Sequence, residues 1–333
     1  MEFTMGGRLE VRITPDDVGK RVSVRRVVGP AGEGAKFTDT VGVLTSWDDG
    51  VLSVTTKDGE GVRIAESSLV AGKVVPPAPA RRRGPAASFG ELALTTARAW
   101  QPVESEPLGD WRLRAAGGFT RRANSVLPLG DPGLPLDEAL GTVRRWYGER
   151  GLPACIQAAT GAEGTQERLC ADLEEHGWRR EVTAEVRIAS LAPIGDLDHD
   201  VSAVRTSREP GAGWLSRYQR FETPGPHVLE VLGSGPSVWF ASVPGDGPEG
   251  VPAAIGRCVV DGRWAGFMAV EVDPEQRRRG LATAVMTALA RTALAEGASA
   301  AWLQVEADNE GARALYDGMG FATHHRYHHF RCA

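Results

Sequence analysis

The spacing of hydrophobic residues divides the chain into three blocks, and the first block is all-β. Residues 8–75 alternate apolar and polar positions in short runs, with the tight-turn signals Asp48-Asp49-Gly50 and Lys57-Asp58-Gly59 between them. The runs are VSVRRVV (22–28), TVGVLTSW (40–47), VLSVTT (51–56), GVRIAE (61–66) and LVAGKVV (69–75). This pattern predicts a small SH3-like β-barrel around one modest core.

A Pro/Arg-rich segment, PPAPARRRGPAA (76–87), follows the first block. Proline holds the backbone extended and the arginines keep it solvated, so the sequence predicts a semi-rigid linker. A basic tether for RNA, DNA or an acidic partner is the alternative, although three arginines are few for that role.

From residue 88 onward the periodicity becomes mixed α/β. Residues 88–190 predict helices at 89–100, 137–150 and 165–177, and strands at 109–117, 120–129, 153–159 and 181–190. After an irregular stretch, residues 205–333 predict helices at 213–221, 280–296 and 310–320, and strands at 236–243, 253–262, 264–272, 300–307 and 322–332.

The two α/β blocks resemble each other in residues as well as in element order. Each block has a short strand followed by a helix of similar sequence. In the first block these are Cys155-Ile156-Gln157 and RLCADLEEHGW, and in the second they are Trp302-Leu303-Gln304 and GARALYDGMGF. This correspondence places Leu173 opposite Tyr316 and predicts two tandem copies of one unit.

Charge and composition narrow the class of protein. With 38 Lys and Arg against 43 Asp and Glu, the net charge of −5 disfavours a whole surface that coats nucleic acid or an anionic membrane. The sequence has no apolar run that would span a bilayer, and MEFTMGGRLE lacks the apolar core of a signal peptide. We therefore expect a cytoplasmic protein, and the Ala-, Gly- and Arg-rich composition suggests a bacterial source.

The segment AVEVDPEQRRRGLATAVMTALA (269–290) carries candidate chemistry. A predicted buried strand ends at Asp273-Pro274, and RRRGLA (277–282) opens a helix. Gly280 lets a ligand approach the backbone, and the first helical N–H groups, about Arg279 to Thr283, have no partner within the helix. The arginines and the helix dipole add attraction for an anion, so this turn suits a pyrophosphate.

A companion segment, LQVEADNEGARALYDGMGF (303–321), lies about thirty residues downstream of the first. Asn309 is one of only two asparagines in the chain, and Tyr316 follows it by seven residues, or about two helical turns. Together the two segments resemble GNAT-superfamily N-acyltransferases. The resemblance covers residues 205–333, through the R-x-x-G-x-A signature at 277–282 and the N-x-x-A-x-x-x-Y element at 309–316.

The resemblance implies a GNAT fold, acetyl-CoA as cosubstrate and an amine as acetyl acceptor. The pantetheine pairs with the strand before the signature, the pyrophosphate sits on the signature loop, and Tyr316 protonates the departing thiolate. The implied acetyl-CoA-binding residues are Val270, Val272, Arg277, Arg278, Arg279, Gly280, Leu281, Ala282, Thr283, Asn309, Ala312 and Tyr316.

The first α/β block departs from the signature. It reads ANSVLPLGDPGLPLDEAL where a phosphate loop would stand, and Leu173 cannot transfer a proton. We therefore expect residues 88–190 to be a degenerate, non-catalytic GNAT-like unit. The whole chain resembles tandem GNAT proteins of actinobacteria, and more closely a group with an SH3-like domain in front that is labelled histone acetyltransferase-like.

The base that deprotonates the amine stays open. Some relatives place a Glu on the strand before the signature, where this chain has Gly266, and Glu271 alternates to the face opposite Val270 and Val272. Glu230 and Glu306 remain candidates.

The run HHRYHH (324–329) invites a metal interpretation, but on a strand its histidines alternate between two faces, so no metal is expected. Two other function classes stay open: an acyl-CoA-binding sensor without turnover, and a nucleic-acid or protein adaptor acting through the barrel. The barrel would also suit docking of a protein acceptor or formation of a homodimer.

Overall fold

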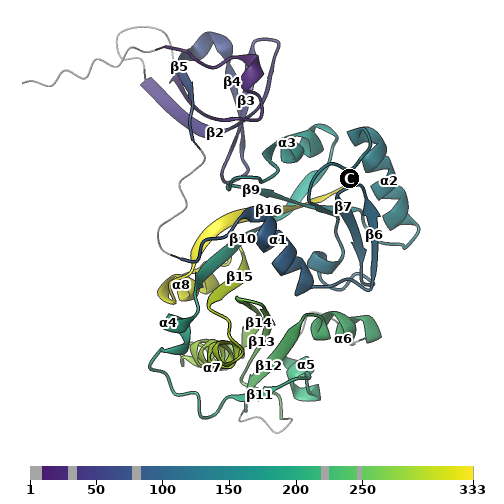
Figure 1. Cartoon of the computed structure of the whole chain (residues 1–333), viewed down its shortest axis with the longest axis vertical. Helices are drawn as coiled ribbons and strands as arrows, with labels where there is room; N and C mark the ends of the chain where they lie inside the picture. The colour runs from purple at the N-terminus through teal and green to yellow at the C-terminus, as the bar shows by residue number, and fades with distance from the viewer. Residues whose placement is uncertain (1–9, 29–35, 77–83, 219–224, 246–249, 333) are drawn as a thin grey trace, which may run out of the picture. The chain divides into compact units, whose positions relative to one another are not determined.

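The computed structural model describes residues 10–28, 36–76, 84–218, 225–245 and 250–332. The chain divides into two compact units: one holds residues 1–80 with 158–178, and the other holds residues 81–157 with 179–333 (Figure 1). Most of the predicted linker (77–83) and the end of the helix predicted at 213–221 lie outside the described residues.

The first unit is built on a five-stranded antiparallel sheet in the order β4-β3-β2-β1-β5. Its strands are β1 (Arg21–Val28), β2 (Lys36–Asp48), β3 (Val51–Thr56), β4 (Gly61–Ala65) and β5 (Leu69–Val74). Asp49 and Gly50 both have positive φ, as the tight turn between β2 and β3 requires. The alternating apolar residues form one small core around Val22, Leu44 and Ile64, so the prediction of four or five short strands is confirmed, with five.

A helix from much later in the chain completes this unit. α3 (Glu167–Glu175) packs against β2 and β3. Just before it, the Thr160 hydroxyl donates a hydrogen bond to the Lys57 carbonyl at 3.1 Å. Residues 158–178 therefore belong to the compact unit of the β domain, although the sequence groups them with the α/β block 88–190. The domain boundaries proposed from the sequence stay predictions.

The second unit contains an eight-stranded sheet in the order β11-β12-β13-β14-β15-β10-β16-β9. The strands are β9 (Cys155–Thr160), β10 (Arg179–Ser190), β11 (Arg205–Ser207), β12 (Ser237–Val243), β13 (Ala254–Asp261), β14 (Trp264–Val272), β15 (Ala300–Glu306) and β16 (Ala322–Arg331). A separate three-stranded sheet contains β6 (Glu104–Leu108), β7 (Trp111–Ala115) and β8 (Leu127–Pro128).

Helices cover both faces of the large sheet. One face carries α7 (Leu281–Ala295) and α8 (Glu310–Gly318), which pack on a core that includes Phe267, Val285 and Leu303. α4 (Ala192–Gly195) packs against α7. The opposite face carries α1 (Phe89–Arg98), α5 (Ala212–Arg217) and α6 (Pro226–Gly233), and α2 (Leu136–Gly148) lies in the same unit.

The two predicted tandem copies do not separate into two sheets. β10, from the first block, pairs on one side with β15 and on the other with β16, both from the second block (Figure 1). What the structure contains is therefore one GNAT-like α+β sheet to which both blocks contribute strands, preceded by a small β domain.

The strand predicted at 120–129 is mostly wrong. Residues 121–123 form a 3-10 turn, Thr120 has φ +53°, and only Leu127–Pro128 pair as a strand. The Asn124 side chain accepts from the N–H groups of Ala116 and Gly118 at 2.8 and 3.0 Å and donates to the Phe119 carbonyl at 2.6 Å. These side-chain bonds hold a loop in place of a strand ladder.

Candidate active site

A groove opens where β14 and β15 part. The two strands run parallel, and their pairing ends at Phe267 opposite Leu303, although both strands continue beyond this point. The cavity there has a volume of about 520 Å³, which is the size of a small-molecule site. Its walls come from β14, β15, β10, β16, α8 and the loop 118–124.

A β-bulge interrupts the pairing of β14 with β13 next to the groove. Met268 pairs with Arg257 and Glu271 with Ile255, so Gly256 alone faces two residues, and Ala269 has φ +52°. A bulge leaves a residue of the ladder unpaired, and Ala269 at this bulge lines the groove. A Cβ on Gly256 would lie 2.5 Å from Cγ1 of Val285, so glycine here also lets α7 approach the sheet closely.

The structure brings four of the sequence-predicted residues to this one cavity. Val270, Asn309, Ala312 and Tyr316 all line it, whereas Val272 packs on the core beneath α7. The Asn309 side chain caps α8 by accepting from the Ala312 N–H at 3.1 Å. The spacing of the N-x-x-A-x-x-x-Y element thus starts the helix that carries Tyr316.

Tyr316 is held by packing against the core, and it lines the cavity from α8. Its ring lies edge-on to Phe321, with 5.9 Å between ring centroids. Within the described part of the chain, the hydroxyl has no hydrogen-bond partner. Burial raises the pKa of the phenol to about 12, so Tyr316 carries its proton at neutral pH.

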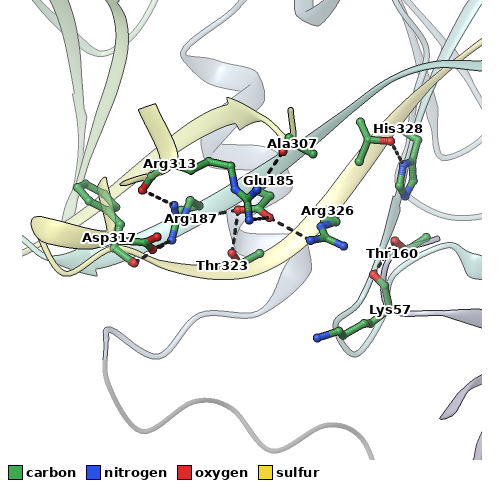
Figure 2. Close-up of polar contacts among 12 residues, drawn as sticks. Lys57, Thr160, Glu185, Arg187, Ala307, Arg313, Asp317, Thr323, Arg326 and His328 are labelled. Atoms are coloured by element: carbon green, nitrogen blue, oxygen red, sulfur yellow. Dashed lines mark hydrogen bonds and ion pairs between the residues drawn. The ribbon is translucent and has the colours of Figure 1, made fainter. Parts of the chain in front are cut away.

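An ion network behind the groove fixes α8 to β10 (Figure 2). The carboxylate of Glu185 accepts from the Thr323 hydroxyl at 3.0 Å and from Arg326 at 3.1 Å. Arg187 pairs with Asp317, the residue after Tyr316, and donates to the Phe321 carbonyl at 3.2 Å. Because these side chains tie α8 to the sheet around Tyr316, they restrict where its ring can lie.

The predicted phosphate loop forms at the start of α7. Gly280 has φ +77°, and the first helical hydrogen bond runs from the Ala284 N–H to the Gly280 carbonyl at 2.9 Å. The N–H groups of Leu281, Ala282 and Thr283 precede that bond and point away from the helix. The His199 ring, which the sequence reading missed, lies over the loop, 2.5 Å from where a Cβ on Gly280 would be.

Arg277, Arg278 and Arg279 precede this turn, and Arg278 has φ +64°. The Arg279 guanidinium is hydrogen-bonded to the Gln276 side chain. Asp273, at the end of β14, is paired with Arg217, and the Glu275 N–H also bonds to this carboxylate and holds its pKa below the usual range. The turn between β14 and α7 is therefore locally fixed before any ligand binds.

Glycine at position 266 leaves room for the Trp302 side chain of the neighbouring strand. A Cβ on Gly266 would lie 2.2 Å from Cζ2 of the Trp302 indole. Trp302 is 1% exposed and lines the cavity. The place where some relatives carry a Glu is thus filled by an indole ring, and a carboxylate there would not fit.

We expect Gly266→Ala to destabilise the fold by roughly 1–3 kcal/mol, because the added methyl overpacks the core against Trp302. Urea unfolding would measure the loss. Gly141→Ala is the matched control, since a Cβ there meets nothing within 4 Å and alanine favours the helix. Equal stability of Gly266→Ala and the wild type would mean that Trp302 moves aside freely.

The two candidate bases differ in position. Glu306, at the end of β15, lines the groove, whereas Glu230 lies exposed on α6 outside the cavity. Glu271 also lines the groove, and because Val270 and Val272 both pack on the core beneath α7, it alternates to the face away from them, as the sequence predicted. Glu306 is thus the sequence candidate that the geometry retains.

Several groove residues were missed from the sequence. Arg121, Arg122 and Trp100 reach the cavity from the first α/β block, and His329 and Arg331 reach it from β16. The HHRYHH run was the one available signal, since the sequence predicted a strand there with histidines on both faces. In the segments that the structure describes, no three His, Cys, Asp or Glu side chains gather as a metal site.

Comparisons with known proteins agree with this geometry. Residues 87–330 match the model of a family described as "Probable histone acetyltransferase Rv0428c C-terminal", and residues 16–73 match the "Rv0428c N-terminal Sm-like domain". The probable histone acetyltransferase Rv0428c of Mycobacterium tuberculosis is 30% identical over 319 residues, covering 92% of this chain and 93% of that protein. The chain belongs to this family.

Membership makes the protein a GNAT-type acetyltransferase. The N-acetyltransferase YobR of Bacillus subtilis is 27% identical over 248 residues, covering 72% of this chain and 96% of that protein. A GCN5-related N-acetyltransferase from Kribbella flavida has the same fold, with a TM-score of 0.55 at 16% identity over 74% of this chain and 96% of that one. The family description assigns the five-stranded domain as Sm-like, where the sequence suggested SH3-like.

Among the helices of the described segments, none combines the length and the apolarity that a bilayer crossing requires.

Proposed function

We propose that the protein transfers an acetyl group from acetyl-CoA directly to an amine bound in the groove. The observation that carries this proposal is the parting of β14 and β15 beside Tyr316. A groove between diverging strands gives an extended pantetheine free backbone to pair with, and the bulge at Ala269 adds an N–H where the thioester carbonyl would lie.

The residues present fit acetyl-CoA. The free N–H groups of Leu281, Ala282 and Thr283, with the positive end of α7 and the preceding arginines, would hold the pyrophosphate. Val270 and Val272 would offer backbone groups to the pantetheine, with Asn309 and Ala312 opposite. When bound, acetyl-CoA supplies the activated acetyl thioester.

The protein's own groups would then move two protons. The amine nitrogen attacks the carbonyl carbon, the N–C bond forms and the C–S bond breaks. We assign the protonation of the departing thiolate to Tyr316, whose raised pKa keeps its proton available. We assign the amine's proton to Glu306, the carboxylate at the end of β15. The acetylated amine and free CoA leave.

The first α/β block would play a different part. We propose that residues 88–190 are a degenerate GNAT copy that shapes the acceptor side of the groove, since the loop 118–124 and Trp100 line the cavity. The relative Rv0428c is described as a probable histone acetyltransferase, and the acceptor here is proposed only as an amine.

One acetyl-CoA should bind per chain, because only the second block carries the R-x-x-G-x-A turn at a helix start. Isothermal titration of the full-length protein with acetyl-CoA should give a stoichiometry of one, and free CoA thiol should appear when an amine acceptor is added. Two sites per chain, or no binding at all, would contradict the proposal.

A further inference from the structure

The wall of the acceptor half of the groove contains polar atoms that no described residue satisfies. Trp100, Gln304 and His329 line the cavity, and Nε1 of Trp100, Oε1 of Gln304 and both ring nitrogens of His329 are buried without a hydrogen-bond partner among the described residues. Trp100 and His329 are each only 3% exposed. Buried polar groups without partners cost free energy, so the wall on this side of the cavity is polar rather than a satisfied apolar core.

Arg122 is the cation set into this surface. Its Nε donates to the Tyr327 hydroxyl at 3.0 Å, and its guanidinium carbon lies 5.8 Å from the centre of the Trp100 ring. Its two Nη groups make no hydrogen bond within the described residues. A guanidinium that is anchored through Nε and open at both Nη groups is the geometry that binds a carboxylate in two places.

The charges around Arg122 favour an anion. Arg121 and Arg331 flank Glu181 at 3.9 and 3.2 Å, so three arginines meet one carboxylate on this side of the cavity. His329 adds no charge at neutral pH, because burial and the nearby Arg122 keep its pKa well below the usual range. On this side of the cavity the three arginines outnumber the one carboxylate, which favours a negatively charged group of a ligand here.

The opposite charge lies across the groove. Glu306 lies at the end of β15, whereas Arg122 is hydrogen-bonded to Tyr327 on β16. Ala184 pairs with both Glu306 and Tyr327, so these two residues are two strand spacings apart, or roughly 10 Å. A cavity of about 520 Å³ with a carboxylate on one side and a guanidinium on the other suits a small ligand that carries both charges.

We propose that the acetyl acceptor is a small amine that also carries a carboxylate, and that Arg122 binds this carboxylate through its two Nη groups. The inference rests on the proposed acetyl transfer and names the chemical class of its acceptor. The amine then lies toward Glu306 and the parting of β14 and β15, beside Tyr316.

The test uses acetyl-CoA with paired acceptors and measures release of free CoA thiol by the full-length protein. Each pair holds an amino acid and the same amine without its carboxylate, such as γ-aminobutyrate with propylamine and lysine with cadaverine, and a lysine-rich peptide is added. We expect turnover with at least one carboxylate member and kcat/KM at least about tenfold lower for its partner. Preference for the amines or the peptide, or no turnover with any carboxylate member, overturns the inference.

Substitutions of Arg122 test whether this side chain causes the preference for carboxylate acceptors. Arg122→Gln should raise KM for the carboxylate acceptor by about 10- to 100-fold, the loss of one charged hydrogen-bonded pair, with little change for its carboxylate-free partner. Arg122→Lys should raise KM less than Arg122→Gln does, since lysine keeps the positive charge but lacks the two Nη groups that bind a carboxylate together. Arg112→Gln, on the exposed face of β7 outside the cavity, is the control.

Acetyl-CoA titration separates the two hypotheses. If acetyl-CoA binds and a carboxylate-free amine is acetylated best, the acceptor class is wrong while the proposed transfer stands. If acetyl-CoA does not bind, both fail. If Arg122→Gln does not fold, the kcat/KM values of the wild-type protein for the two acceptors of each pair still test the inference.

Discussion

Tyr316→Phe is expected to lower kcat by about 10² to 10⁴, the usual loss on removing a general acid. The substitution removes only the hydroxyl, which has no partner in the described part of the chain, and keeps the edge-on contact with Phe321. Acetyl-CoA affinity and the free energy of unfolding should therefore stay close to those of the wild type. Single-turnover acetyl transfer would measure the chemical step, with titration calorimetry as the binding check.

The pH profile gives a second readout of Tyr316. Because burial raises its pKa to about 12, the phenol stays protonated well above neutral pH. Transfer by the wild type should accordingly not fall through ionisation of this group between neutral pH and about pH 10.

Tyr147→Phe is a matched control for the loss of a buried phenol. The Tyr147 hydroxyl donates to the Arg114 carbonyl at 2.9 Å and lies outside the groove. Its loss should cost about 1 kcal/mol of stability and leave kcat unchanged. A Tyr316→Phe enzyme with full kcat, under conditions where chemistry limits the rate, would assign the proton to another group.

Local structure in this chain was largely predictable from the sequence. Strict alternation of apolar and polar residues predicted β1 to β4, and the glycine after three arginines predicted the start of α7. Both features are set by residues close together in the sequence. The helix at Asn309 was likewise readable, since a side-chain cap acts within three residues.

Partners across the sheet were not predictable in the same way. EVTAEVRIAS (181–190) reads as a strand, but nothing in it says that β10 will lie between β15 and β16. The sequence therefore did not show that strands of the two blocks lie in one sheet. The groove's acceptor side was missed for the same reason: Trp100 and Arg122 reach His329 only through this long-range pairing.

Two local features also escaped the pattern. The loop 118–124 depends on four hydrogen bonds of the Asn124 side chain, and a side chain that replaces a strand ladder leaves the apolar pattern unchanged. The bulge at Ala269 needs a positive φ at alanine, which the chain tolerates only because the surrounding sheet holds it. Alternation alone consequently did not reveal that the ladder with β13 is interrupted here.

The second large effect is expected at the start of α7, where Gly280→Asp should abolish most acetyl-CoA affinity. Gly280 has φ +77°, and a Cβ there would meet the His199 ring at 2.5 Å. The new carboxylate would also repel the pyrophosphate in front of the free N–H groups, each of which contributes roughly 1.5–3 kcal/mol to a charged partner. We therefore expect a loss of several kcal/mol in binding, measured by titration calorimetry.

Controls separate this charge effect from backbone strain. Gly280→Ala introduces the same φ penalty and the same contact with His199 but no charge, so it should bind acetyl-CoA more tightly than Gly280→Asp. Gly133→Asp places the same residue at φ +73° in the loop before α2, where the first block has no R-x-x-G-x-A turn. It should leave acetyl-CoA affinity unchanged, although strain at this position lowers stability by about 1 kcal/mol or more. If Gly280→Asp bound acetyl-CoA like the wild type, the pyrophosphate would lie away from α7, and Arg277, Arg278 and Arg279 would be an ordinary solvated helix start.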